Sequence, residues 1–330
     1  MITTTSYPKA EPQKPKRLRD QFREWLVFHH YSPRTADAYV ARVLDFVLWS
    51  GKRDPLTMGG VEVNGFLSYL ANERRVTATT QTQALCALVR FYDGCLGKPL
   101  GDIGKFEYAS TPSRLPVVMA QGEVKRVLAA LPAAHRLMGQ LLYGCGLRLM
   151  ECCRLRVKDV DFERGEIMVR AGKGDKDRVV MLPPSIVTEL QAHLRFSRSR
   201  FDADGGWRVH LPGALLRKYP GYEADWRWQY VFPAKSVSTD PTDGRLKMHH
   251  VHENTLQKAV KVAVDTVGLT KRVSCHTFRH SFATHLIEAG TPIYDVQKLL
   301  GHSRLETTMI YNHVAMPAEK RIKSPLEGLV

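Results

Sequence analysis

Cysteine is scarce in this sequence and is not arranged for cross-linking or for metal binding. Six cysteines occur among 330 residues, and no two of them form a C-x-x-C pair or a repeated ligand spacing. Most lie inside apolar helical patterns, where a free cysteine behaves as a small hydrophobic side chain. This usage argues against a disulfide scaffold and favours a reducing cytoplasm.

Long apolar runs and acidic residues are also in short supply. No run approaches the length of a membrane span, and the N-terminus lacks an apolar signal core. Asp and Glu number 33 against 48 Lys and Arg, which gives a formal net charge of +15. Such a surface favours nucleic acid or an anionic membrane as partner, and without a span the membrane is the weaker choice. Because no acidic cluster is present, we expect neither a metal ion nor a cofactor.

The most unusual group of side chains lies near the C-terminal end. His276 and Arg279 are three residues apart and share one face of a helix. His302 follows Leu-Gly at a helix boundary, and Tyr311 comes nine residues later. Core packing does not account for this order of groups, so the stretch is a candidate catalytic site.

The chain divides into two expected domains, in keeping with its length. The first carries four apolar stripes at helical spacing, starting near Leu18, Tyr39, Val63 and Leu85, with no strand signal between them. It is predicted to be a small helical bundle. The expected segments are a disordered basic tail (1–16), the helical domain (17–100), a Gly- and Pro-rich linker (101–116), a second domain (117–316) and a polar tail (317–330).

Arg148 is the first candidate site residue of the second domain. It opens a segment that is apolar on several sides, so its side chain is expected to turn inward, and a buried arginine needs a partner. Glu151, three residues later, can hold it. An internal salt bridge and a functional arginine are equally compatible with this segment alone.

Three strands are predicted at 157–162, 166–170 and 178–182. With the helices they make the chain mainly α with a small antiparallel β-sheet, an α+β fold. The last two strands flank Gly172-Lys173-Gly174, which places Lys173 at an exposed hairpin tip. An ordinary charged turn is the alternative reading of this tip.

Glycine, proline and aromatic residues are packed together at 198–235, with arginine and lysine interleaved. Aromatic faces stack on unpaired bases while cations meet the backbone, but a small satellite core would also need such rings, and we expect a mixture. His249 and His250 follow in a basic patch. No Cys or carboxylate stands at ligand spacing from them, so base or phosphate contact is favoured over zinc.

These candidates together suit phosphodiester chemistry. Two fixed guanidiniums can clamp the non-bridging oxygens of a phosphate and stabilise a five-coordinate transition state. A tyrosine hydroxyl can attack phosphorus, a mobile lysine can protonate the departing 5′ oxygen, and a nearby histidine can take the tyrosine proton. The side chains concerned are Arg148, Lys173, His276, Arg279, His302 and Tyr311.

Their order resembles that of the tyrosine recombinases, the phage-integrase family, over roughly residues 17–316. The resemblance implies a SAM-like core-binding domain, a recombinase catalytic domain and a 3′-phosphotyrosyl intermediate made without metal or ATP. It also implies the roles: nucleophile Tyr311; phosphate binding by Arg148, Arg279 and His302; general acid Lys173; proton transfer assisted by His276; and Glu151 orienting Arg148.

A narrower likeness lies in the insert at about 205–235, which resembles the extra segment of integron integrases. That resemblance implies the insertion and excision of gene cassettes, on folded single-stranded cassette sites and a duplex integration site. It implies base-reading roles for Trp226, Trp228, Pro233, His249 and His250. It further implies a homo-tetramer on two DNA sites, in a bacterial cytoplasm at the nucleoid, with the tail 317–330 packed on the neighbouring subunit.

Three other readings stay open at this point. The chain could be a phage-type or chromosome-dimer-resolution recombinase that acts on duplex DNA. It could be a catalytically silent DNA-binding protein of the same fold, although the intact set of reactive residues argues against that. A type IB topoisomerase would relax supercoiled plasmid without a specific site.

Overall fold

The computed structural model describes residues 16–110, 115–170, 177–241, 243–312 and 315. The chain divides into two compact units, residues 1–113 and 114–330. The predicted C-terminal tail, the hairpin tip with Lys173 and nearly all of the predicted N-terminal tail lie outside the described residues.

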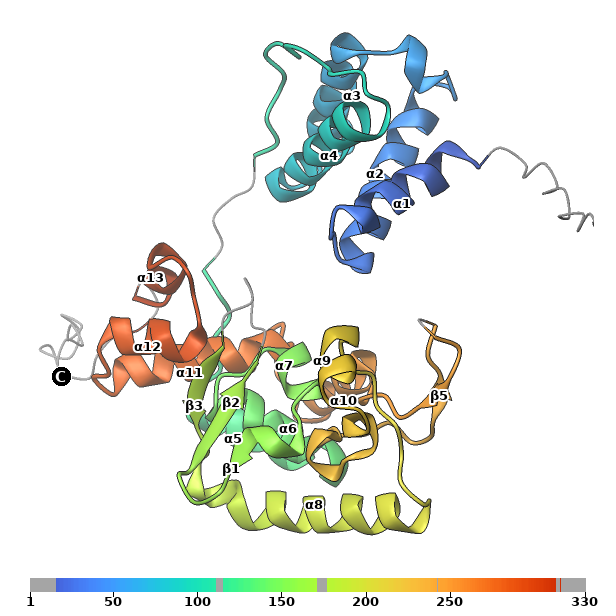
Figure 1. Cartoon of the computed structure of the whole chain (residues 1–330). Coiled ribbons are helices and arrows are strands. Elements are labelled where there is room, and N and C mark those ends of the chain that lie inside the picture. The colour runs from blue at the N-terminus through green and yellow to red at the C-terminus, as the bar shows by residue number, and fades with distance from the viewer. Residues whose placement is uncertain (1–15, 111–114, 171–176, 242, 313–314, 316–330) are drawn as a thin grey trace, which may run out of the picture. The chain divides into compact units, whose positions relative to one another are not determined.

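The first unit is a helical bundle with its own core (Figure 1). Ser32 accepts a hydrogen bond from the backbone of Thr35 and caps the second helix, with Pro33 at the first helical position. The rings of Phe22, Phe46 and Phe66 are buried in the core. The predicted four-helix domain is therefore confirmed. Its helices are α1 (Leu18–Phe28), α2 (Pro33–Trp49), α3 (Gly60–Asn72) and α4 (Ala78–Arg90), and a π-helical turn, Phe91–Cys95, follows α4.

Much of the segment predicted as a linker packs on this first unit. Leu100, Ile103 and Phe106 lie against its core. The amide of Asn64 donates to the carbonyls of Ile103 and Lys105, at 2.7 and 2.8 Å. Polar side chains of the bundle thus satisfy the backbone of a segment that has no secondary structure of its own, and the two units divide only after residue 113.

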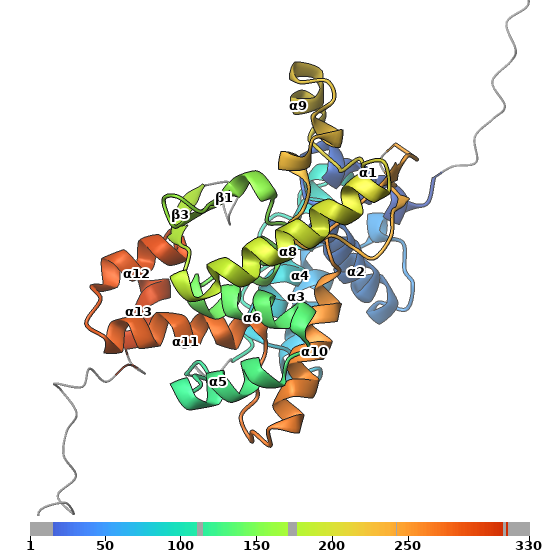
Figure 2. The same cartoon turned by 90° about the horizontal axis from the view of Figure 1, so that it is seen from below.

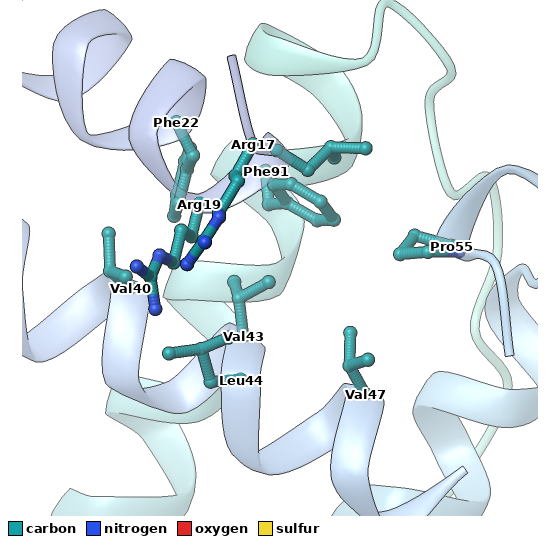
Figure 3. Close-up of a pocket in the computed structure, with 10 residues that line it drawn as sticks. Arg17, Arg19, Phe22, Val40, Val43, Leu44, Val47, Pro55 and Phe91 are labelled. Carbon is teal, nitrogen blue, oxygen red and sulfur yellow. The ribbon is translucent and has the colours of Figure 1, made fainter. Parts of the chain in front are cut away.

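A small apolar pocket of about 210 Å³ lies within the first unit (Figure 3). Its walls come from α1, α2 and Phe91, with the stems of Arg17 and Arg19 among the lining side chains. None of the predicted catalytic residues lines it.

The second unit is built around a larger core of helices and one sheet face. Helix α6 is buried along Leu137, Leu141 and Leu142, as its apolar spacing predicts. The helices of this unit are α5 (Gln121–Ala130), α6 (Ala133–Gly144), α7 (Leu149–Cys153), α8 (Pro184–Ala203), α9 (Gly213–Lys218), α10 (Glu253–Thr266), α11 (Cys275–Glu288), α12 (Ile293–Leu300) and α13 (Glu306–Asn312).

The sheet is antiparallel with strand order β1-β2-β3. Its strands are β1 (Val160–Asp161), β2 (Glu166–Val169) and β3 (Arg178–Met181). Ile167 pairs with both Val160 and Val180. The prediction of a strand from 157 was wrong, because residues 157–159 form a 3₁₀ turn whose backbone is drawn toward Gln229. A second hairpin, β4 (Ser238–Thr239) and β5 (Leu246–Lys247), was not predicted. The class, mainly α with small antiparallel sheets, is confirmed.

Two further clusters flank the main core of this unit. Helices α11, α12 and α13 pack together beside the sheet (Figures 1 and 2). The insert forms a satellite core of its own, made of Phe201, Trp207, Val209, Leu211, Tyr230 and Met248. The first cluster carries most of the candidate catalytic residues, and the second carries the aromatic residues of the insert.

Candidate active site

Arg148 and Glu151 form the contact that their spacing predicts. Arg148 is the N-cap residue of α7, and its backbone N–H donates to Glu151 Oε2 at 2.7 Å. The guanidinium Nη1 donates to Glu151 Oε1, also at 2.7 Å. About 23% of the Arg148 side chain remains exposed, against 8% for Glu151. The arginine is therefore held by its carboxylate while part of its side chain stays exposed.

Arg279 lies at the centre of the site with only 1% of its side chain exposed. Its Nη1 donates to the carbonyl of Gly146 and its Nη2 to the carbonyl of Leu300, both at 2.5 Å. Gly146 has φ +61°, and a Cβ there would lie 2.5 Å from the ring of Phe282. Glycine is thus required at this position, because its turn aims the carbonyl that fixes Arg279.

Arg178 belongs to the site although no motif in the sequence singles it out. Its Nη1 and Nη2 donate to the two carboxylate oxygens of Glu151, at 2.8 and 2.6 Å. Its Nε donates to the carbonyl of Leu299 at 2.8 Å. As the first residue of β3, Arg178 ties the sheet to the end of α12. A basic residue opening a strand is too ordinary a signal to reveal this.

The carboxylate of Glu151 therefore lies near three guanidinium groups. Glu151 contacts Arg148 and Arg178 directly and lies 3.9 Å from Arg279. Burial alone would raise the pKa of Glu151, but Arg178 and Arg148 outweigh it and lower the pKa to about 2. Burial and Arg148 lower the pKa of Arg279 to about 9, so it stays charged at neutral pH. Three cations against one anion leave an excess of positive charge, which suits an anionic ligand.

His302 follows Gly301, which ends α12 in the left-handed conformation with φ +61°. Its Nε2 lies 3.3 Å from Arg279 Nη2, and its Nδ1 lies 2.9 Å from Thr308 Oγ1. Burial, with the charges of Arg279 and Arg148, lowers the pKa of His302 to about 3. The ring is therefore neutral. Because Nε2 faces an N–H donor, we assign the proton to Nδ1, which donates to Thr308.

Tyr311 is buried in the same cluster, with 1% of the residue exposed. Its ring stacks on that of His302 with centroids 6.3 Å apart. Its hydroxyl lies 2.9 Å from Nδ1 of His280. Burial raises the pKa of Tyr311, while Arg279 and Arg148 act in the opposite direction. Tyr311, the candidate nucleophile, is therefore close enough to Arg279 and Arg148 of the same chain to feel their charge.

His276 and Lys173 are the two remaining predicted catalytic residues. The ring of His276 meets that of His280 edge to face, with centroids 4.4 Å apart, and it is exposed on α11. Sequence reasoning assigned a role to His276 and passed over His280, although the two are four apart and share a helix face. Lys173 lies outside the described residues, so the structure does not place it.

The predicted base-reading residues lie in the insert and beside it. Trp226 packs on Phe201, with ring centroids 5.5 Å apart. Trp228 packs on Tyr222, and Lys158 Nζ lies 4.0 Å from its ring centre. Both tryptophans are half-buried against the satellite core, so this core, weighed above as an alternative, accounts for part of their conformation.

Pro233, His249 and His250 lie beside the insert, where the ring of His250 meets that of Tyr230 edge to face with centroids 5.4 Å apart. Pro233 and His250 form an antiparallel backbone bridge, and the carbonyl of His249 accepts from the N–H of Ala234. Pro233 also lines a groove of about 810 Å³ between α6, α8 and the start of α10. The groove wall is mostly apolar and includes Phe196, which is 65% exposed, together with Arg200 and Lys235.

In the part of the chain that the structure describes, no group of three or more His, Cys, Asp or Glu side chains is placed to hold a metal ion. Among the same residues, no helix combines the length and the apolarity that a membrane span requires.

Comparison with known proteins gives consistent matches. The phage integrase family matches residues 118–317, and the N-terminal SAM-like domain of phage integrases matches residues 18–102. An "integrase/recombinase" of Escherichia coli is 46% identical over 328 residues, covering 98% of this chain and 97% of the relative. The tyrosine recombinase XerA of Thermococcus kodakarensis is 31% identical over 312 residues, covering 92% and 93%.

Solved structures share the fold at low sequence identity. One is the XerH site-specific recombinase bound to its difH substrate, with a TM-score of 0.57, 22% identity, and coverage of 89% of this chain and 80% of the other. Another is the Tn1549 transposon integrase in complex with transposon right-end DNA, with a TM-score of 0.61, 15% identity, and coverage of 94% and 96%.

Proposed function

The chain belongs to the phage integrase family of tyrosine recombinases, and from that premise we propose that it is an integron-type integrase. A site-specific recombinase acting on DNA follows from the family itself. The finer proposal is that it inserts and excises gene cassettes, and that it cuts and rejoins strands through a 3′-phosphotyrosyl intermediate. The observation that carries the chemistry is the convergence of Arg148, Arg279, His302 and Tyr311. Both arginines lie near Glu151, and His302 lies between Arg279 and the ring of Tyr311.

The scissile phosphate is proposed to bind against Arg148, Arg279 and His302. The partly open Arg148 and the charge excess around Glu151 support this assignment. Tyr311 Oη attacks phosphorus, the P–O5′ bond breaks, and the 5′ oxygen takes a proton from Lys173. The guanidiniums compensate the charge of the five-coordinate transition state, so the proposed reaction uses side chains alone, without metal or cofactor.

The proposed cassette substrate is a folded single strand with unpaired bases. The insert supports this, because it surrounds a satellite core with partly exposed rings and cations. The groove beside Pro233 adds apolar walls with Arg200 and Lys235 among its lining residues. Flat apolar surface next to cations is the chemistry that binds an extruded base. We propose that further contacts to the extruded bases come from Trp226, Trp228, His249 and His250.

The proposed assembly is a tetramer that holds two DNA sites, since exchange between the two sites requires four active sites. XerH and the Tn1549 integrase are described in complex with DNA, and we propose DNA as the partner of this chain too. The tail 317–330 is proposed to pack on the neighbouring subunit, and the cytoplasm, at the nucleoid, is the proposed location.

Covalent trapping tests the proposed chemistry. With a nicked suicide substrate, the wild type should form a stable protein–DNA adduct, and Tyr311→Phe should bind the DNA without forming one. Tyr294→Phe, on an exposed tyrosine of α12, is a matched control and should keep the adduct. A wild type that yields no adduct on any cassette or integration site would favour a catalytically silent DNA-binding protein.

Substrate form tests the integron assignment. The same trapping assay should give more adduct with a folded single-stranded cassette site than with its duplex. Equal or greater trapping on the duplex would favour a phage-type or dimer-resolution recombinase. Relaxation of supercoiled plasmid without a specific site would favour a topoisomerase.

The groove can be tested at an exposed position, where truncation does not disturb a core. Phe196→Ala should weaken binding of the folded cassette site by about 1–3 kcal/mol, the usual value of one base stack, and leave the melting temperature unchanged. Phe28→Ala, at a still more exposed phenylalanine of α1, is the control. Equal losses in both variants would argue against a base-binding groove.

A further inference from the structure

The hydroxyl of Tyr311 is held by a residue that none of the preceding assignments uses. His280 lies on α11 and Tyr311 on α13, and the Nδ1–Oη distance is 2.9 Å. The two rings are tilted at 54° with centroids 5.5 Å apart. The contact is a hydrogen bond to a buried hydroxyl. Tyr311 is one of the most completely buried side chains in the described structure.

The direction of this hydrogen bond follows from the charge states of the two groups. Burial, with the neighbouring His276 and Arg279, lowers the pKa of His280 to about 4, so the ring is neutral at pH 7. Burial keeps the pKa of Tyr311 above its ordinary value, so the phenol holds its proton. The phenol O–H therefore donates, Nδ1 accepts, and the ring proton of His280 sits on Nε2.

The other two histidines of the site are not arranged to accept that proton. Both ring nitrogens of His302 are engaged, one facing Arg279 and the other Thr308. His276 reaches the cluster through the ring of His280, at 4.4 Å between centroids. Among the described residues, His280 is therefore the histidine whose ring nitrogen hydrogen-bonds Tyr311 Oη.

We propose that His280 is the general base that takes the proton of Tyr311 during strand cleavage. As Oη bonds to phosphorus, the Oη–H bond breaks and the proton passes to Nδ1, while the P–O5′ bond breaks and the leaving oxygen is protonated separately. The inference rests on cleavage by Tyr311 and adds to it. His276 is then a positioning residue, whose ring fixes that of His280.

Bound DNA makes His280 a better base than it is in the free protein. The groups facing it are His276, Arg279 and Tyr311, and positive charge nearby opposes protonation of its ring. A phosphate on Arg148 and Arg279 neutralises that charge and stabilises the imidazolium. The base is therefore weak until a scissile phosphate is in place, which limits ionisation of the nucleophile to the DNA complex.

The same helix supplies a matched control pair. One turn further along α11, Nδ1 of His285 lies 2.9 Å from the hydroxyl of Tyr143. Burial raises the pKa of Tyr143 and lowers that of His285, as in the first pair. Atom, distance and helix are alike, but Tyr143 is not at the phosphate site. If both histidine–tyrosine contacts are merely structural, replacing His280 and replacing His285 should have similar effects on cleavage.

The decisive experiment compares His280→Asn and His285→Asn in single-turnover cleavage of a nicked suicide substrate at saturating DNA. Asparagine keeps a hydrogen-bonding group near Nδ1 but cannot accept a proton. His280→Asn should slow adduct formation by about 100-fold or more, the usual contribution of a general base, and His285→Asn by less than about 3-fold. DNA affinity within about 3-fold of the wild type shows that each variant is folded.

A second measurement separates proton transfer from positioning. Fluorotyrosine at position 311 has a more acidic phenol and needs less help from a base. It should shrink the defect of His280→Asn at least about 10-fold. A wild-type rate in His280→Asn, or a defect that fluorotyrosine leaves unchanged, overturns the proposal. A wild type without any adduct would instead remove the proposed cleavage chemistry.

Discussion

At the scale of single residues, the site depends on how a few buried charges are shared. Glu151 accepts hydrogen bonds from both Arg148 and Arg178, and Arg178 also donates to the carbonyl of Leu299. Arg178 thus acts on the reaction through other groups. It fixes the carboxylate that orients Arg148 and the helix end that precedes His302.

Arg178→Met should test this sharing. It leaves Arg148 as the one guanidinium in direct contact with Glu151, with Arg279 3.9 Å away, and should cost about 1–3 kcal/mol of stability while slowing cleavage. Arg178→Lys should restore little, since an ammonium cannot bind both carboxylate oxygens. In single-turnover trapping, the effects of Arg178→Met and Glu151→Gln should not add. Arg164→Met, at an exposed arginine in the turn between β1 and β2, is the control. Additive effects of Arg178→Met and Glu151→Gln would contradict the shared role.

Acid should destabilise the fold through His302 and His280. Their folded pKa values, about 3 and about 4, lie below the unfolded value of about 6.5. Unfolding therefore takes up protons below pH 6.5, so this part of the stability is complete above pH 6.5 and is lost as pH falls toward 4 and 3. Glu151 adds to this loss only below about pH 4.5, because its neighbouring arginines lower its pKa from 4.5 to about 2 in the folded protein.

Urea denaturation of the free protein at pH 7.5 and pH 5.0 measures the effect. The midpoint should fall with the pH, and His302→Asn should flatten the dependence. A midpoint that is constant or rises on acidification would show that the two histidines are not buried as neutral rings.

At the scale of elements, the insert is attached to the catalytic core through Arg156. Its guanidinium donates to the carbonyls of Trp228 and His210, at 2.5 and 3.0 Å, and lies 4.2 Å from the ring centre of Tyr230. The neighbouring β4–β5 hairpin is closed by Lys247, which is 2% exposed and contacts Asp240 and Asp243. The satellite core is thus held in place by buried polar contacts as well as by its rings.

Arg156→Met should loosen the insert while leaving the main core intact. Two partly buried carbonyls lose their donor, which costs at most about 1–3 kcal/mol each. Hydrogen exchange should accelerate in residues 207–230 but not in α6. Arg154→Met, at an exposed arginine two residues earlier, should change neither. Uniform acceleration through the second unit would mean that the insert and the catalytic core unfold as one body.

At the scale of the whole molecule, two separate cores carry a large positive charge. The net charge of +15 makes phosphate contact a general property of the chain, in addition to what the site recognises. Binding strength should therefore be dominated by counterion release, and the chemical step by the buried site.

Salt should separate these two contributions. Affinity for DNA should fall by about 10³-fold or more between 50 and 200 mM salt if six or more phosphates are contacted. The single-turnover cleavage rate at saturating DNA should change little, because the charges around Glu151 are shielded from solvent. A flat affinity, or a cleavage rate that follows the salt, would contradict this division. Binding titrations and trapping kinetics measure both.

The sequence by itself determined the features that depend on neighbours along the chain. Helical periodicity set α1 to α4 and α6, and the Glu151 contact with Arg148 follows from a spacing of three. The candidate residues of the site, from Arg148 to Tyr311, could also be predicted, since the chemistry of each side chain is known from its type.

Only the tertiary structure decided which groups meet across long stretches of chain. Arg178 reaches Leu299, His280 reaches Tyr311, and Gln81 binds the backbone of the segment that reads as a linker. Such contacts depend on where a buried donor finds its acceptor, and no local spacing encodes that choice. The satellite core is a similar case, because whether an aromatic ring packs inward or faces a ligand depends on the surfaces that folding brings beside it.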